Sequence, residues 1–377
     1  MNLLERKNRH FDALFANPRL MWLGQNTNHF PTHPAVVEAM HASIACGEFH
    51  AYAPPAGIEE LRALIREDLD LPDMSVLVTD DGVEGLYNAC RTLAEPGTDF
   101  VTTDPGWKWP MAFAAASGAT PIELPIYDRA QGYRLTPAQL ESAITPRTRI
   151  VYLVDPNNPL GVCYTADEIA AFARIARRAG AYFVHDCTYR QFADAHTLAA
   201  RFYPERTITI YSFSKWLGLA GLRVGALVAH PDLIDRLAAA PPNNLGSNVV
   251  SQRAAIAGLR VKAQWMADVN ARQRRNQRAI ADAAASIPGL TLPVFPSQAN
   301  FLVLECIDAG ITPEALVTAM RSVDIMIRQG TYHTPRFGHR FVKVSTTVPE
   351  AWADAFCAHL PKMVEMARTI EPDTDLF

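Results

Sequence analysis

The middle of the chain alternates between short apolar segments and helical segments, and this alternation restricts the fold more than any other feature of the sequence. The apolar segments are typical of strands buried on both faces, because they lack the alternation of apolar and polar residues found in half-exposed strands. Five of them lie at 75–78, 100–102, 149–154, 182–184 and 207–211. The pattern predicts an α/β fold in which helices cover both faces of a mainly parallel sheet.

The pattern changes after about residue 237, where a Pro-Pro-Asn-Asn segment at 241–244 precedes a long helical stretch. Three further strands are predicted at 300–304, 325–328 and 341–344, and helices begin near residues 313 and 350. We expect three parts: an N-terminal arm at 1–34 that joins the small domain, a large cofactor-binding domain at 35–260, and a smaller α+β C-terminal domain at 261–377.

Composition excludes several classes of protein. The 377 residues are 49% hydrophobic and 20% charged with a formal net charge of -4, which is typical of a globular protein and offers no basic field for nucleic acid. No apolar run reaches the roughly 20 residues needed to cross a bilayer, and the charged N-terminus lacks a secretory core. Six scattered cysteines show no metal-ligand spacing. We therefore expect a reduced, cytoplasmic protein without a metal or membrane partner.

Polar motifs follow the predicted strands where these strands end, and in a parallel sheet such motifs meet at one edge. The motif at 212–225 places Lys215 after two serines and before a glycine-rich turn that leads to Arg223. A partly desolvated lysine can form an imine with an aldehyde, and hydroxyl and guanidinium groups are the donors that a phosphate monoester needs. Together these groups indicate pyridoxal phosphate.

The order of these motifs resembles that of the fold type I pyridoxal phosphate enzymes, the aspartate aminotransferase superfamily, in its class I/II branch. The resemblance covers nearly the whole chain. It implies that Lys215 bonds to the cofactor and later moves the Cα proton, and that Asp186 pairs with the pyridine nitrogen. Asn158 and Tyr189 would contact the phenolic oxygen, with Asn158 also near the substrate, and Trp107 would stack on the ring.

The resemblance also implies a phosphate site and a homodimer with shared active sites. Tyr52 looks like the tyrosine that reaches the phosphate of the neighbouring subunit, and the sequence leaves dimer and tetramer open. The groups implied for the phosphate are the side chains of Ser212, Ser214 and Arg223 and the backbone amides of Gly82 and Val83.

Two departures from the family pattern concern charge. Asp80 and Asp81 stand at a phosphate loop that usually offers small and hydroxyl residues, and we expect one of these two carboxylates to face a cationic group of the substrate. The arginine that normally clamps the substrate carboxylate aligns with Lys343, which cannot form a bidentate fork. Either Lys343 binds as a point charge, or Arg336 or Arg340 takes over. Asn300 matches a turn near the substrate.

These departures resemble a small subgroup, the oxygen- and pyridoxal phosphate-dependent L-arginine oxidases of natural-product pathways. The likeness rests on the motifs at 25–29, 104–110 and 332–338. It implies that dioxygen is the co-substrate and that L-arginine is converted to an unsaturated or 4-hydroxylated 2-oxo acid, with release of ammonia and hydrogen peroxide. His29 would then take part in catalysis as a proton relay.

Three alternatives remain open in the sequence. The main one is a conventional aminotransferase, in which the amino group passes to a second 2-oxo acid. Decarboxylase or lyase chemistry uses the same scaffold. A transcription regulator with this fold as a ligand sensor would need a DNA-binding domain ahead of it, whereas here the fold starts by about residue 25.

Overall fold

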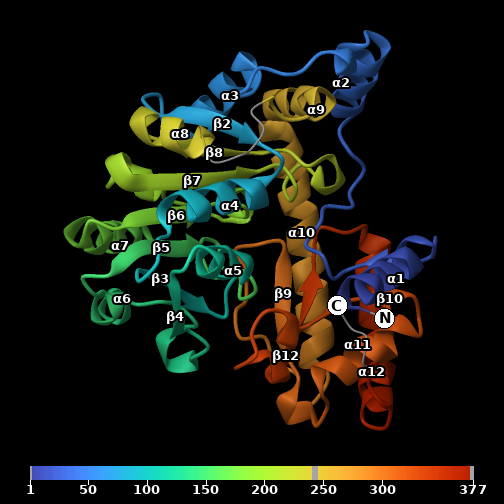
Figure 1. Cartoon of the computed structure of the whole chain (residues 1–377). Coiled ribbons are helices and arrows are strands. Elements are labelled where there is room, and N and C mark those ends of the chain that lie inside the picture. The colour runs from blue at the N-terminus through green and yellow to red at the C-terminus, as the bar shows by residue number, and fades with distance from the viewer. Residues whose placement is uncertain (1, 240–244, 374–377) are drawn as a thin grey trace. The chain divides into compact units, whose positions relative to one another are not determined.

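The computed structural model describes residues 2–239 and 245–373, which form two compact units (Figure 1). One unit comprises residues 31–158 and 162–269, and the other comprises the described parts of 1–30 and 270–377 together with 159–161. The sequence placed the boundaries after residues 34 and 260, and the break it predicted at 241–244 lies outside the described residues. None of the described helices is long and apolar enough to cross a membrane.

The first unit is built on a seven-stranded sheet with the order β2-β8-β7-β6-β5-β3-β4, in which β8 alone runs antiparallel to its neighbours. The strands are β2 (Ser75–Thr79), β3 (Asp99–Asp104), β4 (Thr120–Pro125), β5 (Thr148–Val154), β6 (Tyr182–Asp186), β7 (Thr207–Ser212) and β8 (Gly225–Ala229). The mainly parallel sheet is confirmed. The sequence missed β4, an edge strand with two prolines and partly exposed side chains, and β8.

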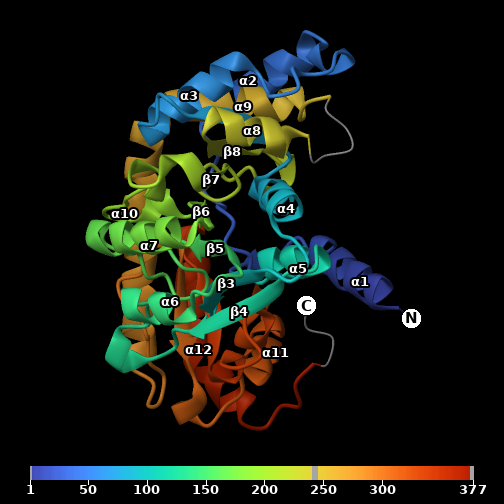
Figure 2. The ribbon, with the colours of Figure 1, turned by 60° about the vertical axis from the view of Figure 1, so that its left-hand side comes forward.

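Helices cover both faces of this sheet, and Figure 2 shows α4 and α5 on one side of the strands and α6 and α7 on the other. The helices of this unit are α2 (Pro34–Ala45), α3 (Glu59–Leu69), α4 (Gly82–Leu93), α5 (Trp109–Ala116), α6 (Pro137–Ala143), α7 (Ala166–Ala179), α8 (Pro231–Ala238) and α9 (Val249–Arg260), and α10 (Lys262–Ala285) begins in this unit and continues into the second. Helix α7 has the capping box and the glycine C-cap that its sequence predicts: Thr165 accepts from the Glu168 amide, and Gly180 is left-handed. The predicted long helical stretch is interrupted at Val261.

The second unit combines the N-terminal arm with the C-terminal α+β part of the chain. Its elements are α1 (Leu3–Phe15), β1 (Met21–Trp22), β9 (Phe301–Glu305), α11 (Pro313–Arg321), β10 (Ile325–Met326), β11 (Arg328–Gln329), β12 (Phe341–Ser345) and α12 (Glu350–Ala367). Strands β11, β12 and β9 form an antiparallel sheet, and β1 pairs in parallel with β10. The strand predicted at 325–328 is therefore two short strands in two different sheets.

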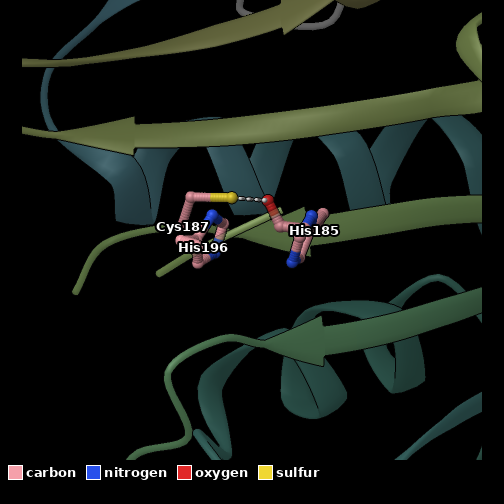
Figure 3. A group of neighbouring side chains, drawn as sticks. All are labelled: His185, Cys187 and His196. Atoms are coloured by element: carbon pink, nitrogen blue, oxygen red, sulfur yellow. Dashed lines mark hydrogen bonds between the residues drawn. The ribbon is translucent and has the colours of Figure 1, made fainter. Parts of the chain in front are cut away.

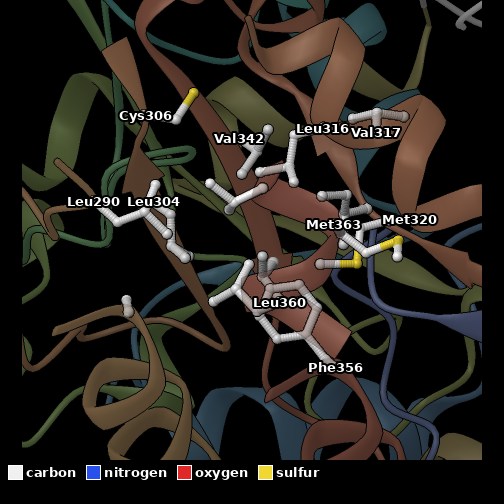
Figure 4. Close-up of a cluster of buried hydrophobic side chains, with 14 of the residues drawn as sticks. Leu290, Leu304, Cys306, Leu316, Val317, Met320, Val342, Phe356, Leu360 and Met363 are labelled. Atoms are coloured by element: carbon white, nitrogen blue, oxygen red, sulfur yellow. The ribbon is translucent and has the colours of Figure 1, made fainter. Parts of the chain in front are cut away.

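One face of the β11-β12-β9 sheet forms the core of this unit (Figure 4). Side chains of α11 and α12 pack with alternate residues of β9 and β12, namely Leu302, Leu304, Val342 and Val344, and with Ile327, which directly precedes β11. Because side chains alternate across a strand, Arg328 and Lys343 lie on the opposite face of the same sheet. Both remain buried there, at 5% and 3% exposure.

Candidate active site

The sheet of the first unit brings the predicted cofactor residues to one edge. Strands β3, β5, β6 and β7 are parallel neighbours, so their carboxyl ends meet at this edge, here called the carboxyl edge. Strand β8 runs the other way and begins there, and β2 ends there because it too is antiparallel to β8. The residues carried to the carboxyl edge by these strand ends are Gly82, Val83, Trp107, Asn158, Asp186, Tyr189, Ser212, Ser214, Lys215 and Arg223.

Lys215 lies three residues beyond β7 and is largely enclosed by protein. Burial lowers the pKa of Lys215 to about 8, and Arg223 acts in the same direction, whereas Asp81 and Asp186 favour the ammonium form. An amine with this pKa is neutral in a substantial fraction of molecules near neutral pH. Lys215 is therefore suited both to attack an aldehyde and to exchange a proton.

Asp186 ends β6 and is 3% exposed, with hydrogen bonds from neutral donors. The Thr188 hydroxyl and amide donate to Oδ1 at 2.6 and 3.1 Å, and the Tyr152 hydroxyl donates to Oδ2 at 3.0 Å. Burial raises the pKa of Asp186, while these hydrogen bonds oppose the rise. Within the described residues no lysine, arginine or histidine forms an ion pair with it. A protonated pyridine nitrogen fits such a carboxylate, and Tyr152 is a positioning residue that the sequence did not reveal.

The remaining ring contacts predicted from the sequence lie in loops at the carboxyl edge. Asn158 follows β5 and Tyr189 follows β6, and both are buried at 3% and 4% exposure. Trp107 lies between β3 and α5 and is partly exposed. A buried amide and a buried phenol at the same edge as Asp186 and Lys215 provide hydrogen-bonding groups for a polar aromatic ring, and Trp107 offers a surface for stacking.

The phosphate donors surround a carboxylate of the chain itself. The Asp81 carboxylate accepts hydrogen bonds from the Gly82 amide and the Ser212 hydroxyl and forms an ion pair with Arg223. The Gly82 amide at the start of α4, the Ser212 hydroxyl and the Arg223 guanidinium form an oxyanion site. We call these three donors, together with Ser214, the phosphate cup. The buried Ser214 hydroxyl has no hydrogen-bond partner within the described part of the chain. The donor set fits a phosphate monoester.

In this structure the Asp81 carboxylate is bound to Arg223, and the expectation that Asp80 or Asp81 faces a cationic substrate group stays a prediction. Asp81 has a φ of 94° and a ψ of 165°, a region that residues other than glycine rarely adopt. The local backbone is crowded as well: a Cβ at Gly225, where β8 begins, would lie 2.6 Å from the Asp81 carbonyl carbon. The short distance explains why a glycine stands at the start of β8.

Tyr52, predicted to reach a neighbouring subunit, is 80% exposed, and its role stays a prediction.

In the second unit, the His29 ring lies 5.3 Å from the Trp352 ring, and its Nε2 is 2.7 Å from the Thr27 hydroxyl. Burial lowers the pKa of His29. The Asn300 amide donates to the Asn26 carbonyl at 2.9 Å and to the Thr347 hydroxyl at 2.8 Å, so it joins the N-terminal arm to the segment that follows β12.

The three candidate carboxylate-binding cations differ in their surroundings. Arg340 is bound to Glu305, with Nε 2.6 Å from the carboxylate, and Arg336 is exposed beside the Phe337 ring. Lys343 is buried on β12, with Nζ 5.3 Å from the centre of the Phe301 ring. The register of the sheet places Arg328 directly opposite Lys343. The sequence did not single out Arg328, because nothing local marks an arginine in a two-residue strand.

A second cluster lies at the end of β6 and comprises His185 and Cys187, which flank Asp186 in the sequence, and His196 from the loop that follows (Figure 3). Their possible ligand atoms lie within 4.8 Å of one another, a proximity that sequence spacing does not show. The Asp155 carboxylate is 3.4 Å from His185 Nε2 and 3.2 Å from His196 Nε2. Burial would raise the pKa of Asp155, but the two histidines bring it below its usual range.

The hydrogen bond that His185 accepts argues against a metal site in this cluster. The Ala199 amide donates to Nδ1 of His185 at 3.2 Å, so the proton of a neutral imidazole is on Nε2. Nε2 is the atom that faces Asp155, and a metal bound there would require the proton on Nδ1. We therefore interpret the cluster as a buried support for the end of β6.

The fold and the carboxyl edge define a pyridoxal phosphate enzyme of the aspartate aminotransferase type. The sequence matches the family Aminotransferase class I and II over residues 18–360, and the chain belongs to this family. Pyridoxal phosphate is the cofactor of the family, and the buried Asp186, Lys215 and the phosphate cup fit it.

Individual relatives agree with this assignment. An aspartate/prephenate aminotransferase of Thermus thermophilus is 30% identical over 217 residues, which cover 55% of this chain and 56% of that protein. The chain thus aligns with little more than half the length of this relative. An aspartate aminotransferase of Pyrococcus horikoshii is 28% identical over 337 residues, 86% of this chain and 85% of that one. The structure of N-succinyldiaminopimelate aminotransferase from Mycobacterium tuberculosis superposes with a TM-score of 0.84 and 25% identity, covering 94% of this chain and 96% of that one.

Proposed function

We propose that this protein is an amino-acid aminotransferase, which moves the amino group of a free amino acid to a 2-oxo acid. The observation that carries the proposal is the position of Lys215, whose pKa is lowered to about 8, on the edge that also holds Asp186 and the phosphate cup. Bound pyridoxal phosphate supplies an electron sink for bond breaking at the substrate Cα. The names of the relatives support amino-group transfer.

The chain's own residues then have defined tasks. Lys215 Nζ takes the proton from the substrate Cα and returns it during transfer. Asp186 stays ionised opposite the pyridine nitrogen, and Tyr152 and Thr188 fix its orientation. The phosphate cup anchors the cofactor through charge-assisted hydrogen bonds.

Oxidation of L-arginine, the function predicted first from the sequence, gains no support from relatives that are named aminotransferases. In that function His29 would relay protons. Its Nε2 instead lies at hydrogen-bonding distance from Thr27, and burial holds its pKa below the usual value. The two functions differ in one measurable respect, because the oxidase consumes dioxygen and needs no 2-oxo acid.

The test is an assay of the purified holoenzyme with each common L-amino acid, with and without 2-oxoglutarate or pyruvate, while dissolved oxygen is recorded. We expect new amino acid to form only with an acceptor present and without oxygen uptake. Uptake of oxygen with hydrogen peroxide release from L-arginine alone would replace the proposal with the oxidase.

A matched pair of variants locates the chemistry in this assay. Lys215→Ala should lose both turnover and the visible absorbance of the lysine-bound cofactor. Lys262→Ala is the control, because burial also lowers the pKa of Lys262 to about 8, but its ammonium is paired with Asp68. An unchanged absorbance band in Lys215→Ala would contradict the assignment of the reactive lysine.

A further inference from the structure

The second unit contains a pocket of about 420 Å³ that is lined by α1, the loop after α1, the end of α11 and the segment after α12. Arg6, Arg9 and His10 line it from α1, and Arg321 lines it from α11. Residues three and four positions apart share one face of a helix, so the three side chains of α1 project to the same side. The volume lies within the range of about 300–1,000 Å³ that is typical of sites for small molecules.

Positive charge prevails in this pocket. The described residues that line it carry three guanidinium groups, from Arg6, Arg9 and Arg321, and one carboxylate, from Asp373. Burial lowers the pKa of Arg321, and Asp373 opposes this change. A cation that is partly withdrawn from water is stabilised by a nearby anion, so the pocket suits an anionic ligand.

A carboxylate of the chain itself occupies part of the pocket. The Arg321 guanidinium donates to Oδ2 of Asp373 at 3.0 Å, and the Asp373 amide donates to the hydroxyl of Thr318 on α11 at 2.9 Å. The Asp373 side chain is 40% exposed, and an ion pair that solvent reaches contributes little to stability. A carboxylate of a ligand can therefore replace that of Asp373 at a small cost in free energy.

The other walls of the pocket suit the remainder of such a ligand. Nη2 of Arg321 lies 3.0 Å from Nδ1 and 3.1 Å from Nε2 of His10, so Arg321 also contacts α1. Leu14 and Leu20 line the pocket as well, and both are buried in a small apolar cluster with Met326. They offer an apolar surface to the carbon atoms of a ligand whose charged groups face the arginines.

We propose that this pocket binds a small organic anion with at least two carboxylates. One carboxylate replaces that of Asp373 at Arg321, and a second one meets Arg9 on α1. The inference does not depend on the proposed function, since the residues of the pocket belong to the second unit and those of the carboxyl edge belong to the first.

The test is a calorimetric titration of the holoenzyme with citrate at constant pH and ionic strength, with the visible absorbance of the cofactor recorded in parallel. Asp373→Asn should bind citrate about three- to fivefold more tightly than the wild type, because it removes a competing carboxylate from a solvent-exposed ion pair. Arg321→Gln should bind citrate at least about tenfold more weakly, because it removes a charged hydrogen-bonding partner. Citrate should leave the cofactor absorbance unchanged in all three proteins.

Arg19→Gln is the matched control. It removes an exposed arginine of the same N-terminal arm that is paired with Asp324 and does not line the pocket, so the citrate affinity should stay as in the wild type. Asp373→Asn separates binding from folding, because damage to the fold would not tighten the binding of citrate. Acetate, which has a single carboxylate, should produce no binding heat at concentrations of citrate that saturate the wild type.

Equal citrate affinity in the wild type, Asp373→Asn and Arg321→Gln would overturn the inference. A change in the cofactor absorbance that follows the binding heat would overturn it as well, because it would place citrate at the active site. A failure to detect amino-group transfer would refute the proposed function alone, since citrate binding is measured without turnover.

Discussion

Asp81 occupies the phosphate cup with its own carboxylate, so its replacement by glycine should tighten the binding of pyridoxal phosphate. The carboxylate uses the Gly82 amide, the Ser212 hydroxyl and Arg223, which are the donors that the phosphate needs. When phosphate binds, the carboxylate must leave these donors and remain nearby as a negative charge. Glycine at position 81 removes this competition and also suits the observed φ of 94°.

The size of the effect follows from the charges. A carboxylate about 6 Å from a phosphate charge, at an effective dielectric constant of about 20, gives a repulsion of about 3 kcal/mol. The Arg223 side chain is 49% exposed, so solvent reaches the cup and reduces the repulsion to about 1–2 kcal/mol. This corresponds to a dissociation constant about 5- to 30-fold lower in Asp81→Gly. The backbone strain is present with and without cofactor and cancels from this ratio.

The assay is a titration of cofactor-free enzyme with pyridoxal phosphate at constant pH and ionic strength, followed by visible absorbance. Asp81→Asn should give part of the gain, because it removes the charge and keeps a side chain in the cup. Asp80→Asn is the control, since Asp80 is the exposed neighbour and carries the same charge. Unchanged or weaker binding by Asp81→Gly, with Asp80→Asn like the wild type, would refute the reasoning.

Three further predictions concern single groups. Because the pKa of Lys215 is lowered to about 8, the fraction of neutral Lys215 increases with pH. In stopped-flow measurements, the capture of pyridoxal phosphate by cofactor-free enzyme should therefore accelerate about tenfold from pH 6 to 7 and level off above about pH 8. A capture rate independent of pH over this range would contradict the prediction. Tyr152→Phe removes one donor to buried Asp186 and should lower kcat about 5- to 30-fold while the protein stays folded by circular dichroism; full activity would exclude a positioning role. Asp155→Leu should lower the unfolding free energy, measured with denaturant, by about 3 kcal/mol, because it leaves the buried histidines without their carboxylate. A chelator should leave the melting temperature of the wild type unchanged, because the hydrogen bond to His185 argues against a metal in the cluster of His185, Cys187 and His196. A chelator-induced drop in the melting temperature would indicate a metal.

The positions of several elements could be predicted because their signals are local. The helix caps at Thr165 and Gly180 depend on a few consecutive residues, and the structure has them as the sequence predicts. The buried strands of the parallel sheet were recognisable from their apolar composition. The convergence of Lys215 and Asp186 followed from topology, since parallel strands end at the same edge.

Other features depend on contacts between distant residues, which the sequence does not encode locally. The pairing of β8 between β2 and β7, the contact of Asp81 with Arg223, and the cluster around Asp155 each join segments separated by many residues. Their energies arise from burial and charge pairing in the folded chain, and no short sequence pattern reports them.

The sequence by itself determined the class of fold and the cofactor, and it predicted Lys215 as the residue that bonds to the cofactor, because a strand-end lysine with phosphate donors is a combination set by covalent chemistry and strand order. Only the tertiary structure decided what surrounds each candidate cation. Arg340 is neutralised by Glu305, whereas Arg328 is buried opposite Lys343 without a carboxylate partner within the described residues. The physical reason is that the charge of an arginine is fixed by its chemistry, but its freedom to bind an anion depends on the residues that the fold places around it.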